Sequence, residues 1–185
     1  MRAIYSGLIV VVLAGCARYS SSEVRPSAWA APLEIDGVQN LHRVSPDLYR
    51  SEQPTAAGMA GLEELGIRTV VNLRACHSDK NEIAGTGLAR VNIPFHTWDP
   101  DEDELIRFLR LATAPEKSPV LVHCWHGSDR TGAMCAAYRV VVQGWSKDEA
   151  IREMKRGGYG HHKIWENLQR WIRDLDVEKI RAALP

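Results

Sequence analysis

The residues most able to do covalent chemistry lie in one short segment, Val120 to Gly132. It contains Cys124 and, six positions later, Arg130, with a glycine between them. A thiolate is a strong nucleophile, and a planar guanidinium can grip two oxygens of a phosphate while staying charged at any relevant pH. The pair therefore indicates a thiolate that attacks a phosphorus atom held beside the arginine.

The sequence around this pair favours a strand, a loop and a helix N-terminus. Val120 to Val122 is an apolar run that fits a buried strand, and apolar residues recur at helical spacing from Ala133 to Val141. A loop at a helix N-terminus presents unpaired N–H groups and the positive end of the helix dipole, which bind anions and stabilise a thiolate. A buried structural cysteine is the alternative for Cys124, but the flanking strand and helix favour a phosphate-binding loop.

The segment HCWHGSDRTG resembles the Cys-x5-Arg loop of cysteine-dependent protein tyrosine phosphatases, in particular the small dual-specificity group. The resemblance extends from Val38 to about Trp171, and within that group it points to bacterial periplasmic tyrosine phosphatases. It implies that Cys124 is the nucleophile and that Arg130 clamps the phosphate. It implies neither a cofactor nor a metal.

The resemblance also implies roles for the neighbours of this pair. His123 is expected to brace the loop and to tune the cysteine, and Thr131 to stabilise the thiolate as it leaves during hydrolysis. The loop itself is expected to hold the phosphate through Trp125, His126, Gly127, Ser128, Asp129 and Arg130. For the side chain of His126, phosphate contact and a neutral surface position remain equal alternatives.

A general acid is needed over the leaving oxygen, because thiolate attack on a phosphate monoester expels an alkoxide or phenoxide. Asp101 to Glu104 precede an apolar helical pattern, so we interpret them as capping and dipole partners. Asp99 lies earlier in the loop and matches the general acid of the family. Asp129 is a rival, since an acid at that position also occurs in myotubularin lipid phosphatases, but a loop-bracing or solvent-facing role is favoured for it.

Strands and helices alternate along the rest of the chain. Strands are expected at 48–50, 68–73, 91–95 and 120–122, and helices after Thr55, Asp101, Ser146 and Trp165. The pattern predicts one α/β domain with a short, largely parallel central sheet and helices on both faces. Active loops then gather at the carboxyl ends of the strands, which places residues 74–79 and 96–103 near the phosphate loop.

Cys76 is expected beside the phosphate loop because it follows the strand at 68–73. We hypothesise that Cys76 closes a reversible disulfide with Cys124 and protects the nucleophile from overoxidation. The alternative is an unpaired loop cysteine. Cys135 lies on the inner face of the helix and is expected in the core.

The N-terminus reads as an export and anchoring segment. Residues 1–15 combine Arg2 with a short apolar core, and Leu13-Ala14-Gly15-Cys16 resembles the lipobox of bacterial lipoproteins. Cys16 is then the lipidated N-terminus, 16–32 a tether and 33–185 the phosphatase domain, with ordinary cleavage without lipid as the alternative. We expect a lipoprotein on the periplasmic side, and Ala17 after the cysteine favours the outer membrane.

The charge balance excludes some partners. The chain has 23 basic and 23 acidic residues, so it carries no net positive charge that would favour nucleic acid. As a separate expectation, the protein is a monomer. Its seven histidines show no metal-ligand spacing, because the adjacent His161 and His162 are expected to point apart.

The expected substrate is a protein phosphotyrosine, with phosphoserine or phosphothreonine as slower substrates. Phosphatases of inositol phosphates or phosphoinositides are the main alternative, but they carry additional Lys or Arg inside the loop, where this chain has Trp125, His126, Ser128 and Asp129. A phosphoprotein-binding module with little activity would have lost the cysteine or arginine. A tyrosine-phosphatase-like arsenate reductase would carry its loop near the N-terminus, whereas about two-thirds of this chain precedes Cys124.

Overall fold

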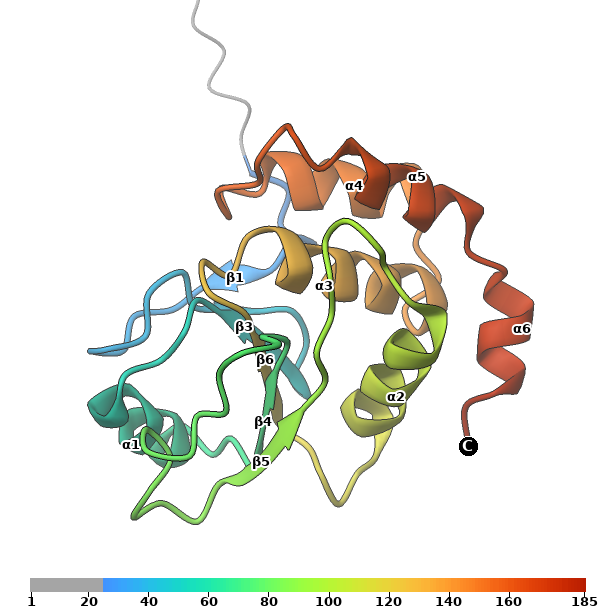
Figure 1. Ribbon diagram of the computed structural model, residues 1–185. Helices are drawn as coiled ribbons and strands as arrows, with labels where there is room; N and C mark the ends of the chain where they lie inside the picture. Colours follow the sequence, from blue (N-terminus) through green and yellow to red (C-terminus); the bar gives the residue numbers. More distant parts are fainter. Residues whose placement is uncertain (1–24) are drawn as a thin grey trace, which may run out of the picture.

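A mixed sheet of six strands lies at the centre of residues 25–185, the part of the chain that the computed structural model describes (Figure 1). The strand order is β1-β2-β3-β6-β4-β5. The bounds are β1 Ala31–Pro32, β2 His42–Arg43, β3 Leu48–Ser51, β4 Thr69–Asn72, β5 Ala89–Asn92 and β6 Val120–His123. The expected signal segment 1–15 and Cys16 lie outside the described residues.

The four longer strands, β3, β6, β4 and β5, run parallel, and β1 and β2 pair antiparallel at one edge. β6 lies between β3 and β4, and its last residue, His123, is in register with Ser51 and Asn72. The strands therefore end at the same edge of the sheet. This edge gathers the loops that follow β3, β4, β5 and β6, as the sequence predicts.

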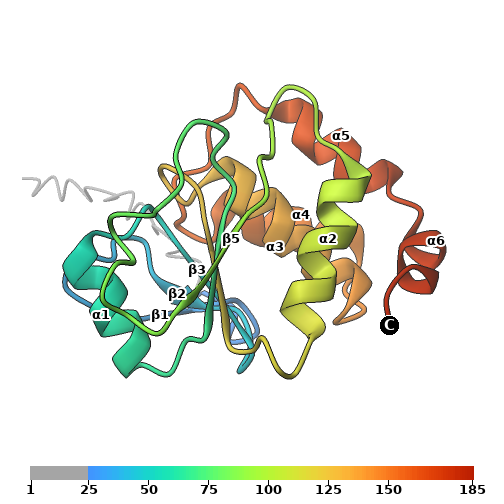
Figure 2. The same ribbon diagram turned by 60° about the horizontal axis from the view of Figure 1, so that its bottom comes forward.

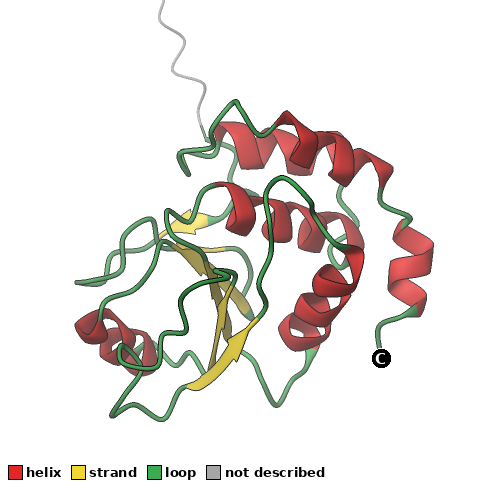
Figure 3. Cartoon of the chain, in the orientation of Figure 1, coloured by secondary structure: helices red, strands yellow, loops and turns green. Residues whose placement is uncertain are grey.

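Helices cover both faces of the sheet (Figures 2 and 3). One face is covered by α1 (Ala56–Glu64), and the other by α2 (Glu102–Thr113) and α3 (Asp129–Val141). α4 (Lys147–Arg156), α5 (Glu166–Asp174) and α6 (Val177–Ala182) pack outside α3. As a result α3 is buried along nearly its whole length, so the helix that carries Arg130 is fixed on every side.

Side-chain caps explain where several helices begin. The Thr55 hydroxyl accepts a hydrogen bond from the N–H of Gly58, and Ser146 forms the expected capping box with Glu149. The Asp101 carboxylate accepts from the N–H groups of Asp103 and Glu104, which confirms its interpretation as a cap. β5 ends earlier than the expected strand 91–95, because Pro94 has no N–H to donate, although Phe95 still bonds Leu73 O at 3.1 Å.

Residues 25–32, expected at the end of the tether, instead belong to the folded domain. Ala30 is 1% exposed, and its N–H donates to Glu153 Oε1 at 2.6 Å. Arg25 donates to the hydroxyl of Tyr159 at 2.9 Å, and β1 extends the sheet beside β2. Sequence composition did not reveal this packing, because it rests on backbone pairing and on a few polar contacts rather than on an apolar pattern. Among residues 25–185, no helix combines the length and apolarity that crossing a bilayer requires.

Candidate active site

The loop from Cys124 to Ser128 links β6 to the N-terminus of α3, as predicted. Its close turn depends on Gly127, which has a φ of +69°. A Cβ atom at this position would lie 2.5 Å from Ser51 O and 2.6 Å from Glu52 N, closer than real contacts allow. The loop can therefore pack against the end of β3 only with glycine at this position.

The carbonyl groups of this loop are held by partners outside it. Trp125 O accepts from Gln53 N at 3.1 Å, and His126 O accepts from Asn40 Nδ2 at 3.0 Å. Gly127 O accepts from the guanidinium of Arg50. In contrast, no N–H group of residues 125–130 donates a hydrogen bond to any atom within residues 25–185. The loop thus offers a set of free N–H donors to an anion.

Arg50 is a brace that the sequence did not single out. Its side chain is buried beneath the loop, where its guanidinium lies 3.7 Å from the centroid of the Tyr159 ring. Tyr159 also accepts a hydrogen bond from Ser128 Oγ at 2.7 Å through its backbone carbonyl. Arg50 and Tyr159 together fix the second half of the phosphate loop. The position of Arg50 on β3, next to β6 in the sheet, is a tertiary feature without a local sequence signal.

The candidate nucleophile lies at the start of this arrangement. Cys124 is 3% exposed and lines a cavity of about 650 Å³ together with Arg130. The hydroxyl of Thr131 is fully buried and has no hydrogen-bond partner among the described residues. This free hydroxyl in the first turn of α3 fits the expected role of stabilising the thiolate. Cys135 is in the core, as expected, and burial raises its pKa to about 11.

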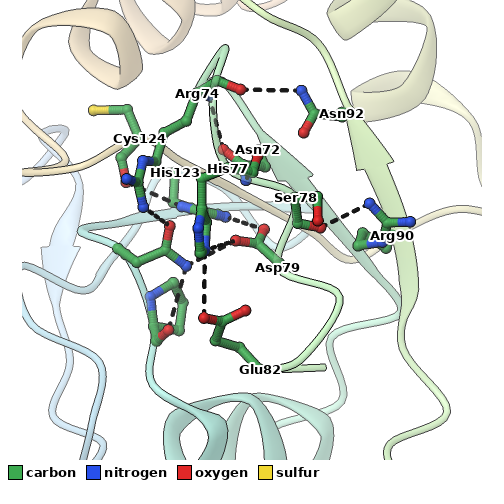
Figure 4. A network of polar contacts seen from close by, with 12 residues as sticks. Asn72, Arg74, His77, Ser78, Asp79, Glu82, Arg90, Asn92, His123 and Cys124 are labelled. Carbon is green, nitrogen blue, oxygen red and sulfur yellow. Dashed lines mark hydrogen bonds and ion pairs between the residues drawn. The ribbon is translucent and has the colours of Figure 1, made fainter. Parts of the chain in front are cut away.

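His123 lies directly behind the nucleophile and contacts two oxygen atoms (Figure 4). Its Nδ1 is 3.1 Å from Cys124 O, and its Nε2 is 2.8 Å from Asp79 Oδ2. Asp79 also accepts a hydrogen bond from Gln53 Nε2 at 2.8 Å. Burial acts to raise the pKa of Asp79, but the bonds from His123 and Gln53 outweigh burial and hold that pKa below its usual range. Asp79 ends the segment 74–79 that the sequence places near the phosphate loop, but no local motif marks its side chain as a partner of His123.

A second guanidinium reaches the cavity from outside the phosphate loop. Arg74, at the end of β4, donates to Gln53 Oε1 at 2.9 Å and lies 4.1 Å from the centroid of the Trp125 ring. Burial and the nearby charge of Arg130 lower the pKa of Arg74, although an arginine in a protein stays protonated. The cavity therefore holds more positive charge than the loop sequence alone suggests.

The carboxylate of Asp129 contacts two histidine side chains. Its carboxylate lies 2.9 Å from His161 Nδ1 and 2.7 Å from His162 Nδ1, and it also accepts from the N–H of His162. Burial acts to raise the pKa of Asp129, but these contacts outweigh burial and lower it. Asp129 thus has the loop-bracing position expected for it. The expectation that His161 and His162 point apart is wrong, because the loop around Gly160, with φ of +80°, turns both rings toward one carboxylate.

Asp99 lies in the exposed loop between β5 and α2. Its neighbours Phe95, His96, Thr97 and Trp98 line the cavity, whereas Asp99 does not. The loop is held to α5 by a hydrogen bond from Asn167 to Thr97 O. The structure therefore brings the loop of the expected general acid to the rim of the cavity but leaves its carboxylate outside.

The rim of the cavity is markedly apolar. Trp98, Trp125 and Ile164 are 69%, 52% and 79% exposed and stand around the opening. Cys76 is exposed and lines the same cavity as Cys124, as expected from its place after β4. His126 is also exposed at this rim.

One group of described residues has the donor atoms of a cation site. The ligand atoms of His77, Asp79 and Glu82 all lie within 4.8 Å of one another. His77 Nε2 is 3.2 Å from Asp79 Oδ1 and 3.4 Å from Glu82 Oε1, so the ring itself lies between the two carboxylates. We assign this group to the charge network behind the phosphate loop.

Comparison with known proteins gives consistent matches. Residues 34–170 match a family model described as a DSP-PTPase phosphatase fused to NAD+ kinase. The dual specificity protein phosphatase TpbA of Pseudomonas aeruginosa strain UCBPP-PA14 is 35% identical over 185 residues, which cover 100% of this chain and 84% of TpbA.

Solved structures agree with these matches. A crystal structure of P. aeruginosa TpbA superposes with a TM-score of 0.78 at 37% identity, covering 86% of this chain and 98% of that one. A second TpbA crystal structure, in complex with pTyr, has a TM-score of 0.77 at 36% identity and the same coverage. The core catalytic domain of the PP-IP phosphatase SIW14 from S. cerevisiae is 22% identical, with a TM-score of 0.70 over 80% of this chain and 93% of that one, and shares the fold.

Proposed function

The chain belongs to the DSP-PTPase family of dual-specificity and tyrosine protein phosphatases, and we propose that it hydrolyses phosphotyrosine through a cysteinyl-phosphate intermediate on Cys124. The observation that carries this proposal is the loop of free N–H groups around Cys124 at the N-terminus of α3. Together with Arg130, it forms a seat for a phosphate with a thiol at its base.

In the first step, the Cys124 thiolate attacks phosphorus and forms an S–P bond. The bond between phosphorus and the tyrosine oxygen breaks, and that oxygen takes a proton from Asp99. The N–H groups of residues 125–130 and the guanidinium of Arg130 hold the phosphoryl oxygens throughout. Because Asp99 is exposed at the rim, its loop has to close on the bound substrate for this proton transfer.

In the second step, a water molecule attacks phosphorus on the intermediate, and the S–P bond breaks. Asp99, now ionised, accepts a proton from the water, so the acid of the first step is the base of the second. Cys124 leaves as a thiolate, which the free hydroxyl of Thr131 stabilises. Inorganic phosphate leaves, and the enzyme returns to its starting state.

The apolar rim supports phosphotyrosine as the substrate. Trp98, Trp125 and Ile164 can pack against an aromatic ring whose phosphate rests in the loop, whereas an inositol ring offers only hydroxyl and phosphate groups. The relative TpbA has been solved in complex with pTyr. Arg74 favours inositol phosphates instead, because it adds a cation beyond those of the loop.

A substrate panel tests this function. Phosphotyrosine and phosphothreonine peptides and an inositol polyphosphate are compared at equal concentration, with Cys124→Ser as the control. We expect the phosphotyrosine peptide to be hydrolysed fastest and the variant to be inactive. Preference for the inositol polyphosphate, with loss of that preference in Arg74→Ala, would assign the cavity to the alternative substrate.

We further propose that the protein is exported and lipid-anchored through Cys16 on the periplasmic side, with the outer membrane favoured. The support is the sequence of residues 1–16. With the domain starting by Arg25, the tether is reduced to about residues 17–24. Labelling with radioactive palmitate, compared between the native chain and Cys16→Ser, tests the anchor. An unlabelled and freely soluble native protein would contradict it.

Cys76 is proposed as a redox partner of Cys124. Both thiols line one cavity, and both are unpaired. A peroxide would oxidise the Cys124 thiolate to a sulfenic acid, and the thiol of Cys76 would then condense with it, forming the disulfide and releasing water. Peptide mapping after peroxide treatment tests this step. Sulfonic acid at Cys124 with Cys76 still free would exclude it.

A further inference from the structure

We propose that Asp79 is a positioning residue of the phosphatase reaction, whose carboxylate keeps His123 protonated on both ring nitrogens and so places a fixed positive group behind Cys124. The inference rests on the proposed function, because it concerns the same thiolate. It adds a residue that acts through His123 and does not itself touch the substrate.

The contacts of His123 determine its protonation. A neutral imidazole has one N–H donor and one acceptor nitrogen, and only the protonated ring has two donors. In this structure both nitrogens face oxygen atoms, Cys124 O at 3.1 Å and Asp79 Oδ2 at 2.8 Å. A backbone carbonyl cannot donate, so Nδ1 carries a hydrogen. Nε2 carries the second hydrogen as long as Asp79 is ionised.

The surroundings of Asp79 keep its carboxylate ionised. Oδ1 accepts a hydrogen bond from Gln53 Nε2 at 2.8 Å and lies 3.2 Å from His77 Nε2, which in turn lies 3.4 Å from Glu82 Oε1. The hydrogen bonds from Gln53 and His123 both favour the charged carboxylate. The backbone of Asp79 has a φ of +51°, a conformation that few side chains other than Asn and Asp adopt readily.

Burial makes this pair strong. The side chains of His123 and Asp79 are both 0% exposed, so water does not screen the charges. Hydrogen bonds between ionised partners are shorter and stronger than neutral ones, and low local polarity increases the effect. The positive ring faces the Cys124 peptide and the negative carboxylate lies on the far side. A thiolate at Cys124 is therefore favoured, in addition to the effect of the helix dipole.

A second chain of contacts connects Asp79 to the cavity, through the side chains of Gln53 and Arg74. Gln53, which donates to Asp79, accepts from Arg74 Nη1 at 2.9 Å, and Arg74 stacks on Trp125. Arg74 and Arg130 line the cavity with Cys124, and so do the titratable side chains of His126, Asp129 and His162. One buried carboxylate thus joins the base of the phosphate loop, through His123, to a cation at the opening of the cavity.

The variant Asp79→Asn separates charge from shape, because an amide oxygen can still accept a hydrogen bond from His123. The first readout is the rate of alkylation of Cys124 by iodoacetamide as a function of pH, measured with the other two described thiols, those of Cys76 and Cys135, replaced by serine. We expect the midpoint of this profile to move to higher pH. We also expect kcat/KM to fall about 10- to 100-fold at pH 6 and to recover at higher pH.

Two further variants show whether the effect passes through His123. In Glu82→Gln, which changes only the far end of the network, we expect both profiles to stay within about 2-fold of the native enzyme, the size of an ordinary surface change. In the double variant Asp79→Asn/His123→Asn, we expect a loss no greater than in His123→Asn alone. Additive losses, or an equal loss of activity at every pH with an unchanged alkylation profile, would overturn the proposal.

A measurement on the native protein does not depend on whether a variant folds correctly. The ¹⁵N chemical shifts of His123 distinguish a neutral from a doubly protonated ring, and we expect both nitrogens to be protonated at neutral pH. A neutral tautomer would overturn the proposal. The NMR and alkylation measurements involve no turnover, so a negative result in them contradicts the role of Asp79 alone. The phosphatase mechanism has a separate test, because activity in Cys124→Ser would contradict it.

Discussion

The phosphate loop and the loop that carries Asp99 contribute the two halves of the reaction, but they are held very differently. Each carbonyl from Cys124 to Gly127 has a hydrogen-bond partner: the ring of the preceding His123 for Cys124, and groups from other parts of the chain for Trp125, His126 and Gly127. In the loop before α2, Trp98 and Asp99 project into solvent, and Asn167 binds Thr97 O. The seat for the phosphate is thus formed in advance, whereas the proton donor has to approach with the substrate.

The largest effect is expected where the preformed seat meets the substrate. Arg130→Lys keeps the positive charge but loses the planar fork that holds two phosphoryl oxygens. We expect kcat/KM for a phosphotyrosine peptide to fall about 10²- to 10³-fold, as for the loss of one preorganised donor. Steady-state kinetics measures this fall. A loss of less than about 3-fold would mean that the loop N–H groups suffice without the fork.

The second-largest effect is expected in the loop that carries Asp99. Asp99→Asn removes the proton donor, so phosphoenzyme formation should slow about 10²-fold for a poor leaving group and much less for a good one. Single-turnover kinetics on phosphotyrosine and on an aryl phosphate with an acidic leaving group makes this comparison. Asp101→Asn is the matched control, since Asp101 caps α2, asparagine can make the same cap, and the leaving-group dependence should not change. Equal rates for Asp99→Asn and native enzyme on the poor substrate would contradict the assignment.

A smaller effect would come from distorting the fixed loop without removing a chemical group. Gly127→Ala places a Cβ atom against Ser51 O and Glu52 N at a positive φ, so we expect about 1–3 kcal/mol of lost stability and about 10-fold lower kcat/KM. Thermal unfolding and kinetics on the same preparation show both. Gly144→Ala is the matched control, because Gly144 also has a positive φ but no atom lies within 4 Å of its added Cβ. Activity should fall in the first variant alone.

The smallest effect concerns Asp129, the rival acid. Because its contacts with His161 and His162 lower its pKa in the folded state, Asp129 adds stability at neutral pH that is lost as the pH falls through that lowered pKa. Asp129→Asn should therefore lower Tm by about 2–4 °C at pH 7, and the difference should begin to shrink below about pH 4 and vanish once the pH is below the lowered pKa of Asp129. Activity should remain within about 3-fold of native. A leaving-group effect as large as that of Asp99→Asn would move the acid role to Asp129.

The features that could be predicted from the sequence are those that depend on neighbouring residues. The strand before Cys124, the helix after Gly132 and the caps at Asp101 and Ser146 follow from local patterns, and the structure confirms them. The family resemblance is also confirmed by the matching relatives. Each of these features leaves a local sequence pattern, such as an apolar period, a capping residue or a short motif.

The sequence predicts that residues 74–79 lie near the phosphate loop, but it does not show which side chains hold that loop. Arg50, Gln53, Arg74 and Asp79 come from other strands and loops, and only the parallel order of β3, β6 and β4 brings them to the loop. The packing of residues 25–32 and the meeting of His161 and His162 at Asp129 have the same origin. Tertiary contacts between short polar segments leave no periodic signal.

The central claim is that Cys124 carries the phosphoryl group during the reaction. Rapid quenching in acid during turnover of a phosphotyrosine peptide, followed by mass spectrometry of the cysteine peptides, tests it most directly. We predict one phosphoryl group on Cys124 in the native enzyme, a larger trapped fraction when Thr131 is replaced by alanine, and none in Cys124→Ser. Turnover without any phosphoryl group on Cys124, or with the group on another residue, would contradict the account.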